Sequence, residues 1–287
     1  MTSPMTSPTP SPALAAPARR VHAGFSAARV GAMVLRYWYL LANSWPRAVE
    51  LVYWPTVQML TWGFVQSYIA AKSPYFAGAG GLFVAALLLW DVLLRSQQGF
   101  AFAFLEEMWS RNLGNLLMSP LRTSEFVASL MVISLIRLTI GMVPVTLIAI
   151  PLFGFNIWGL GGALAIFFAN LVATGWAMGF LIVGLLLRHG LGAEALSWSL
   201  MFVLMPLACV YYPVATLPPW LQPIALALPP THVFEGMRAV LIDHVFRLDH
   251  LAWAVGLNLV WLGAGIVAFR VLLAAARRAG SLVQQGE

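Results

Sequence analysis

The sequence has only one cysteine, Cys209, and only one lysine, Lys72. A single cysteine excludes a disulfide within the chain, and its place in an apolar run indicates a packing role. The lysine follows Ala71, so the chain has no phosphate-binding loop of the GxxxxGK[ST] type. It also has no HExxH metal motif and no GxSxG nucleophile elbow. Nothing in the sequence therefore indicates an enzyme acting alone, and we predict no catalytic residues, cofactor or metal in this chain.

Charged residues are also scarce: they make up 9% of the 287 residues, while 61% are hydrophobic. An ordinary soluble domain has about 25% charged residues, so we expect an all-α integral membrane protein. A spanning helix needs about 20 mostly apolar residues. Six runs meet this requirement, at about residues 49–71, 82–104, 127–150, 157–187, 195–212 and 251–269.

Prolines and glycines divide two long charge-free stretches. The stretch between Arg137 and Arg188 is too long for one helix, and we expect it to divide at Pro144, Pro151, Gly154 and Asn156. The stretch from Ala195 to Phe234 is rich in proline. We predict one span there, followed by short re-entrant helices, because irregular backbone at membrane depth persists only when it is buried in protein.

The distribution of basic residues predicts the orientation, because basic residues stay preferentially on the cytoplasmic side. Six spans place both termini on one face with the 105–126 and 188–194 connections. That face would hold Arg19, Arg20, Arg29, Arg36, Arg47, Arg111, Arg122, Arg188, Arg270, Arg277 and Arg278. The other face would hold Lys72, Arg238 and Arg247. We therefore predict cytoplasmic termini in the inner (plasma) membrane, and the net charge of +6 does not indicate nucleic-acid binding.

The chain is expected to form one domain. Residues 1–26 are rich in Pro, Ser, Thr and Ala and would be a disordered cytoplasmic tail. Residues 27–275 would be a single six-helix transmembrane domain, and residues 276–287 a short cytoplasmic tail.

An amphipathic helix is predicted ahead of the first span. At 100° per residue, its arginines fall within about 20° of one line, with apolar residues opposite. Such a helix lies in the membrane interface, with arginines among lipid phosphates and tryptophans at the acyl boundary. The residues concerned are Arg29, Arg36, Trp38, Trp45 and Arg47.

The segment "LEEMWSRNLGNLLMSPLRTSEF", residues 105–126, places several charges between two apolar runs. Helical spacing puts apolar residues on one face, namely Leu105, Trp109, Leu113 and Leu116. Glu107, Arg111 and Asn115 follow at i, i+4 and i+8 on another face, where the first two could pair. Ser119-Pro120 would end the helix. We predict a short amphipathic helix on the cytoplasmic surface, with an ordinary solvated connector as the alternative.

Three charged residues, Asp91, Arg95 and Arg137, lie well inside predicted spans. Charges at that depth usually pair or face a cavity. Their similar distances from the 105–126 turn predict a cluster of Asp91 with Arg95 and Arg137 that faces the interior. A structural ion pair and a substrate-lining role both remain open.

Two further patterns carry less information. Gly175 and Gly179 form a GxxxG pair, which permits close helix contact. Three histidines lie on the outer side with acidic residues, but their spacing fits no recognised ligand pattern, so no metal site is predicted. They are His232, His244 and His250.

The chain resembles the membrane subunit, or permease, of type-2 ABC exporters in two motifs, in the order of these motifs and in the predicted topology. "EEMWSRNLGNLLMSPLRTSEF" is similar to the family's acidic residue, Gly-x-Leu-x-x-Leu-Leu and Ser/Thr-Pro-Leu pattern. "YYPVATLPPWLQPIALALPPTHVFEGMRAVL" is similar to its outer segment, which ends in Glu-x-x-Arg. One departure is Pro230 before Thr231. The resemblance extends from about residue 27 to 275.

The resemblance implies a homodimer that binds a separate soluble ATP-binding-cassette subunit, which would hold ATP and magnesium. Residues 105–120 would be the coupling helix, with contacts from Glu106, Glu107, Trp109, Arg111 and Asn115. Glu125 would cap or pair at the start of the third span. The outer re-entrant segment would include Tyr211, Tyr212, Pro213, Trp220, Glu235 and Arg238. The substrate would be an amphiphile: a lipid, a lipid-linked glycan or a drug.

Two alternatives remain. One is an ATP-independent secondary transporter or channel that uses Asp91, Arg95 and Arg137, although no internal repeat supports it. The other is a membrane scaffold that anchors a partner through residues 105–126.

Overall fold

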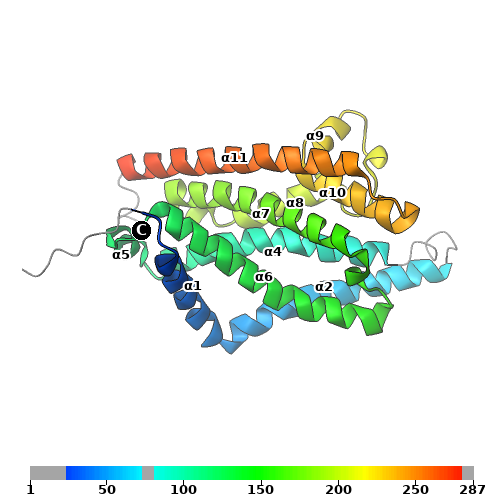
Figure 1. Cartoon of the computed structure of the whole chain (residues 1–287), viewed down its shortest axis with the longest axis horizontal. Coiled ribbons are helices and arrows are strands. Elements are labelled where there is room, and N and C mark those ends of the chain that lie inside the picture. The colour runs from blue at the N-terminus through cyan, green and yellow to red at the C-terminus, as the bar shows by residue number, and fades with distance from the viewer. Residues whose placement is uncertain (1–23, 73–80, 280–287) are drawn as a thin grey trace, which may run out of the picture.

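The computed structural model describes residues 24–72 and 81–279. Within these ranges the chain forms ten α-helices and no strand (Figure 1), as expected for an all-α protein. The tail predicted over residues 1–26 lies almost wholly outside the described residues. The last helix continues to Ala279, four residues beyond the predicted end of the transmembrane domain at 275, and the domain bounds stay a prediction.

The helices follow one another with short connections. In chain order they are α1 (Ala27–Ala42), α2 (Trp45–Lys72), α4 (Leu82–Trp109), α5 (Leu113–Met118), α6 (Thr123–Phe153), α7 (Gly162–His189), α8 (Leu196–Leu207), α9 (Gln222–Leu226), α10 (Pro229–Arg238) and α11 (Leu248–Ala279). Shorter turns of helix are η1 (Ile157–Leu160), η2 (Gly190–Ala193), η3 (Val214–Thr216) and the π-helical η4 (Ala239–Asp243).

Three helical segments are long and apolar enough to cross a membrane: Thr123–Phe153, Gly162–Ala193 and Leu248–Ala279. They correspond to the third, fourth and sixth predicted spans. Helices α2 and α4 have 28 residues each, which is sufficient length for a bilayer core of about 30 Å, but they are not among the three. Helix α8 has only 12 residues, so the span predicted over 195–212 is shorter than expected.

Helix α6 shows where the chain breaks after Arg137. It continues through Pro144 and Pro151 to Phe153, so the prediction that these prolines divide the stretch is wrong. The break comes at Gly154, which has φ 64°, a left-handed conformation that glycine adopts at little cost. The Asn156 side chain then accepts a hydrogen bond from the Trp158 N–H. A carbonyl freed by proline is tolerated when neighbouring helices cover it.

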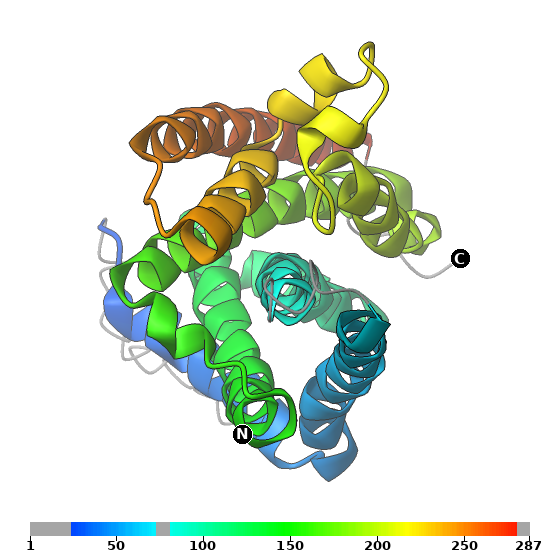
Figure 2. The same ribbon diagram turned by 90° about the vertical axis from the view of Figure 1, so that its right-hand side faces the viewer.

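Helix α4 lies at the centre of the bundle, between α2, α6 and α7 (Figure 2). Helix α11 packs on the side of α7 that faces away from α4 (Figure 2). Two glycines of α7 allow it to pack closely on α4. A Cβ on Gly175 would lie 2.0 Å from Ser96 Oγ, and a Cβ on Gly179 would lie 2.9 Å from Phe100 Cδ1. The close helix contact predicted from the GxxxG pair is therefore confirmed.

Candidate functional site

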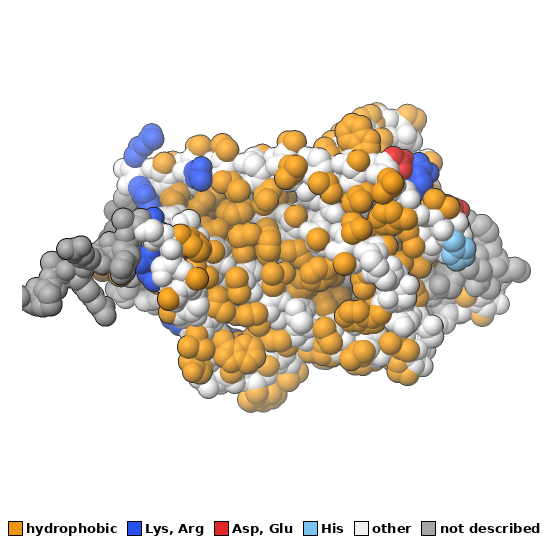
Figure 3. Space-filling view, in the orientation of Figure 1, with side chains coloured by type: hydrophobic (Ala, Val, Ile, Leu, Met, Phe, Trp, Pro, Cys, Tyr) orange, Lys and Arg blue, Asp and Glu red, His pale blue; other side chains and the backbone are white. Residues whose placement is uncertain are grey.

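Three glutamates gather at one end of the bundle, where α4 and α11 end and α1, α5 and α6 begin (Figure 1). Each of them pairs with arginine from another helix: Glu106, Glu107 and Glu125. Basic side chains also gather at this end of the surface (Figure 3). We call these three glutamates and their arginine partners the basal network.

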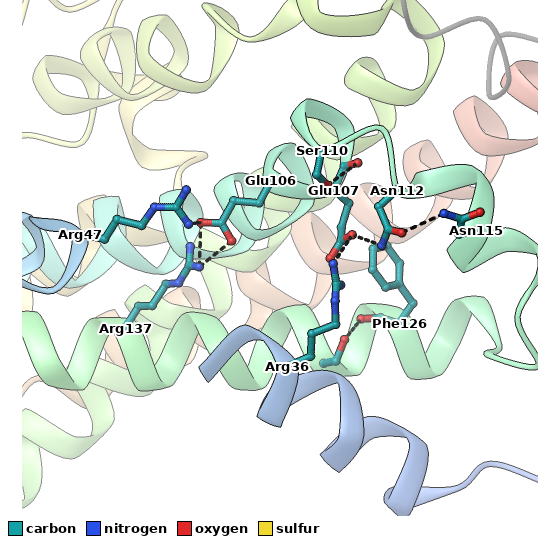
Figure 4. A network of polar contacts seen from close by, with 10 residues as sticks. Arg36, Arg47, Glu106, Glu107, Ser110, Asn112, Asn115, Phe126 and Arg137 are labelled. Carbon is teal, nitrogen blue, oxygen red and sulfur yellow. Dashed lines mark hydrogen bonds and ion pairs between the residues drawn. The ribbon is translucent and has the colours of Figure 1, made fainter. Parts of the chain in front are cut away.

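Glu107 joins α4 to α1. Its side chain is 1% exposed and pairs with Arg36, whose Nη1 contacts Oε1 and whose Nη2 donates to Oε2 at 3.1 Å. Asn112 Nδ2 donates to the same Oε2 at 2.8 Å. The hydrogen bond to Glu107 raises the pKa of the Arg36 guanidinium, so Arg36 stays charged at neutral pH. Both carboxylate oxygens are therefore occupied as acceptors (Figure 4).

Glu106 joins α4 to α6 and α2. Arg137 Nη2 donates to its Oε2 at 2.8 Å and to its Oε1 at 3.0 Å. Arg47 Nη1 lies 3.6 Å from Oε1. Figure 4 shows the two arginines converging on one carboxylate from different helices. Charge-assisted hydrogen bonds of this kind are stronger than neutral ones. Glu106 therefore links α4 firmly to α6 and, through Arg47, to α2.

Glu125 joins the first turn of α6 to α1. Arg29 donates to both of its oxygens, from Nε at 2.8 Å and from Nη2 at 2.5 Å. The backbone N–H groups of Ser26 and Arg122 also donate to it, at 2.8 and 3.0 Å. A carboxylate near a helix N-terminus satisfies free N–H groups and interacts favourably with the helix dipole. The prediction that Glu125 caps or pairs here is confirmed.

The single helix predicted over residues 105–120 is wrong in its geometry. Helix α4 continues to Trp109, Arg111 takes a left-handed φ of 53°, and the six-residue α5 begins at Leu113. Glu107 therefore pairs with Arg36 instead of Arg111. The prediction assumed uninterrupted 100° steps, and the reversal at Arg111 ends that periodicity.

The break also changes which side chains reach the surface. Glu106 and Glu107 point inward, with side chains 13% and 1% exposed, so they do not present carboxylates to a partner. Leu105 and Leu113 are buried as expected, but Trp109 is 49% exposed. Trp109, Arg111 and Asn115 are the predicted coupling residues that remain on the surface.

The predicted interfacial helix is corrected in its extent. Helix α1 ends at Ala42, so Trp45 and Arg47 belong to α2. Arg29, Arg36 and Arg47 also pair with glutamates from α4 and α6, partners that the prediction did not include, while their contact with lipid phosphates stays a prediction. Trp38 and Trp45 are 41% and 75% exposed, and their position at the acyl boundary stays a prediction.

The predicted cluster of Asp91 with Arg95 and Arg137 forms only in part. Asp91 is fully buried, with Arg95 Nε 4.0 Å from its Oδ2, whereas Arg137 pairs with Glu106. Helical side chains lean toward the N-terminus of their own helix. The N-terminus of α6 lies at the basal end and that of α4 at the opposite end, so Arg137 leans toward the basal network and Asp91 leans away from it.

At the opposite end, short helices separate α8 from α11, in the region of the predicted re-entrant segment. Arg238 is 8% exposed, and its Nη1 donates to the carbonyls of Cys209 and Val210 at 2.9 and 3.3 Å. Glu235 Oε1 accepts from Arg238 Nη2 at 3.0 Å and from the Val214 N–H at 2.8 Å. The Glu-x-x-Arg motif thus fixes the chain reversal after α8.

The aromatic residues of this segment have different surroundings. Tyr211 stacks on Trp62 of α2 with ring centroids 5.0 Å apart, and the Tyr212 hydroxyl donates to the Pro206 carbonyl at 2.8 Å. Pro213 precedes η3, and Trp220 is 71% exposed. Only Trp220 is therefore free to contact lipid or an amphiphile with most of its ring.

Arg238→Met is expected to destabilise the protein by about 2–3 kcal/mol, because buried carbonyls and Glu235 lose a charged donor. Thermal unfolding in detergent would measure this. Arg247→Gln is the matched control, since the pair of Arg247 and Asp249 is half exposed and a solvent-screened pair contributes little to stability. Equal melting temperatures for both variants would contradict the role of Arg238.

Two of the outer histidines contact each other, with 3.3 Å between the Nδ1 atoms of His232 and His250. His232 Nε2 lies 2.9 Å from the Leu226 carbonyl, which can only accept, so this nitrogen carries the proton. His250 then donates through Nδ1. In the described part of the chain, no group of three His, Cys, Asp or Glu side chains is placed to hold a metal.

The long apolar helices indicate a multi-pass membrane protein. The chain belongs to the ABC-2 type transporter family, whose family model matches residues 32–242. It is therefore a transmembrane transporter subunit, a permease component without an ATP-binding cassette, and permeases of this family generally work with an ATP-binding subunit. No curated protein matches the chain.

Sequence reasoning did not anticipate Asn112 or the partners in the basal network. Arg36 and Glu107 lie 71 positions apart, and Arg29 and Glu125 lie 96 apart. No local pattern relates such positions. One available signal was the excess of arginine before the first span, where three of the four arginines of the basal network lie.

Proposed function

We propose that this chain is the membrane subunit of an ATP-driven exporter of amphiphiles. Two copies would form the translocation pathway, and a separate ATP-binding-cassette subunit would bind at α5 and the end of α4. The proposal includes the six-span layout, with α2, α4 and α8 as the remaining spans and both termini cytoplasmic in the inner membrane.

The observation that carries the proposal is a continuous set of contacts from the surface of α5 to α1. Asn115 is exposed, and its Nδ2 donates to Asn112 Oδ1 at 3.2 Å. Asn112 in turn donates to Glu107, which holds Arg36. A displacement of α5 would therefore be passed to α4 and α1 together. A solvated connector would need no such contacts, so they favour a coupling role.

Surface composition supports the orientation and is compatible with a dimer. Basic side chains gather at the basal end (Figure 3), as the positive-inside rule requires of the cytoplasmic side. Helix α2 leaves Phe64 and Tyr68 61% and 62% exposed, and α8 leaves Phe202 68% exposed. A second copy would cover such apolar side chains.

The pairing of Arg137 with Glu106 weakens the alternative of a secondary transporter, because it removes Arg137 from the charges near Asp91. Asp91 and Arg95 would then have to couple ions alone. An exporter subunit needs no such coupling.

Arg111→Glu is expected to lower the ATPase activity that copurifies with the tagged protein at least about tenfold, which corresponds to about 1.4 kcal/mol of binding free energy. A charge reversal on the surface weakens binding by this much only when the residue lies in the interface with the partner. The assay is a pull-down from native membrane in mild detergent. Arg188→Glu, an exposed arginine at the end of α7, is the control and should keep wild-type activity. If no ATPase copurifies with wild type in several detergents, the proposal fails.

A further inference from the structure

A groove of about 720 Å³ lies between α6 and α11 near the basal end. Phe180 of α7 contributes to its lining. Its other apolar lining comes from Val127, Met131, Ile266, Phe269 and Leu273. The groove is separate from the basal network, since none of the three network glutamates lines it.

The polar lining of the groove carries positive charge. Arg270 and Arg277 lie two turns apart on α11, and Arg277 Nη2 donates to Thr123 Oγ1 at 3.4 Å. No acidic residue of the described chain lines the groove. Among the described residues, neither arginine forms an ion pair, whereas seven other arginines pair with a carboxylate. Within residues 24–72 and 81–279, the two arginines therefore have no carboxylate partner.

The dimensions of the groove fit one half of a bilayer. Ile266 and Arg277 are 11 residues apart in one helix, which corresponds to about 16 Å at 1.5 Å per residue. Half of a hydrocarbon core of about 30 Å is about 15 Å. An acyl chain that begins beside the arginines would end near Ile266.

We propose that this groove binds an anionic phospholipid of the leaflet at the basal end. The phosphate interacts with Arg270, Arg277 and the Thr123 hydroxyl, and an acyl chain lies on Phe180 and the apolar walls. A second copy of the chain is a poorer occupant, because it would place like charges together. A soluble phosphate would leave the apolar walls uncovered.

Such a lipid would connect the first turns of α6 to the last turns of α11. Glu125 in that part of α6 holds α1 through Arg29, so lipid occupancy would influence the stability of the basal end. The proposed lipid site requires only an anionic phospholipid in the leaflet at this end of the molecule. It does not depend on whether the protein exports a substrate.

The test is native mass spectrometry of the purified full chain after exchange into mixed phosphatidylcholine and phosphatidylglycerol. Wild type is expected to retain phosphatidylglycerol in preference to phosphatidylcholine. Replacing both Arg270 and Arg277 by glutamine should lower that preference at least about tenfold, because two charge-assisted contacts are lost. Arg188→Gln is the matched control and should behave as wild type.

Ala128→Trp provides a second variant, because it fills the groove and keeps both arginines. It should lower retention of both lipids while the protein remains folded by circular dichroism. Equal retention of the two lipids by wild type would overturn the proposal. An equal loss of phosphatidylglycerol preference in Arg188→Gln would also overturn it, because it would indicate that general surface charge attracts the lipid. Concentration-dependent self-association in place of lipid binding would identify a second copy of the chain as the occupant.

Discussion

Glu107→Gln is expected to reduce the ATP-driven activity of the assembled transporter at least about tenfold, while the ATP-binding partner still copurifies. In the native site both Glu107 oxygens accept hydrogen bonds, from Arg36 and Asn112. Glutamine offers one oxygen and one NH₂ group, so a donor would face a donor. The contact between α5 and α1 would be lost at its central residue.

The stability cost of this change should be moderate. Arg36 is 37% exposed on its side chain and can turn partly to water, so we expect about 1–3 kcal/mol. Glu107→Arg would cost more, because it would place a second positive charge directly against Arg36. The conservative variant is therefore the sharper probe of function.

A double-mutant cycle distinguishes coupling from simple destabilisation. Arg36→Gln should lower ATPase activity as much as Glu107→Gln, and the double variant should be no worse than either, because residues in contact are not additive. The control is Glu194→Gln, which changes a glutamate beyond the end of α7 and should leave activity unchanged. Full additivity would show that Glu107 and Arg36 act independently and would contradict the coupling role.

Gly265→Ala is expected to destabilise the bundle by about 3 kcal/mol or more. A Cβ at this position of α11 would lie 2.6 Å from the Ala177 carbonyl oxygen of α7 and 3.3 Å from Phe180 Cβ. Because the nearest atom belongs to the backbone, no side-chain rotation relieves the clash. The two helices would have to move apart along their contact.

Gly263 provides a matched control two residues away in the same helix. A Cβ there would meet nothing within 4 Å, so Gly263→Ala should be neutral or should stabilise the helix by up to about 1 kcal/mol. Unfolding in detergent, followed by circular dichroism, would measure both variants. A loss of stability in Gly265→Ala alone is the expected result, and equal loss in both would refute the close contact between α7 and α11.

Several local features of the fold could be predicted because they depend on neighbouring residues. The apolar runs predicted helices near α6, α7 and α11, and the proline-rich stretch predicted short helices before α11. The GxxxG pair predicted a close contact, which the glycines of α7 make with α4. Pro144 misled this reasoning, since a proline within a membrane helix is tolerated when other helices cover the freed carbonyl.

The site was less predictable because it depends on which helices meet. Glu107 and Arg111 had the correct spacing for a pair, yet the left-handed turn at Arg111 separates them. Arg137 has the correct depth to approach Asp91, yet it leans toward the basal end and pairs with Glu106. For Arg137, the partner was decided by the direction in which its side chain leans along the helix. The spacing of residues in the sequence does not give that direction.

The sequence by itself determined that this is a helical membrane protein, which residues are too polar to face lipid, and which end is basic. Those properties follow from composition and periodicity, because the cost of exposing charge or free backbone groups to lipid depends on each residue and its neighbours. Only the tertiary structure decided that the three basal glutamates hold α1, α2 and α6 together. Ion pairs between distant positions depend on helix order, tilt and side-chain direction, and these arise only when the helices pack.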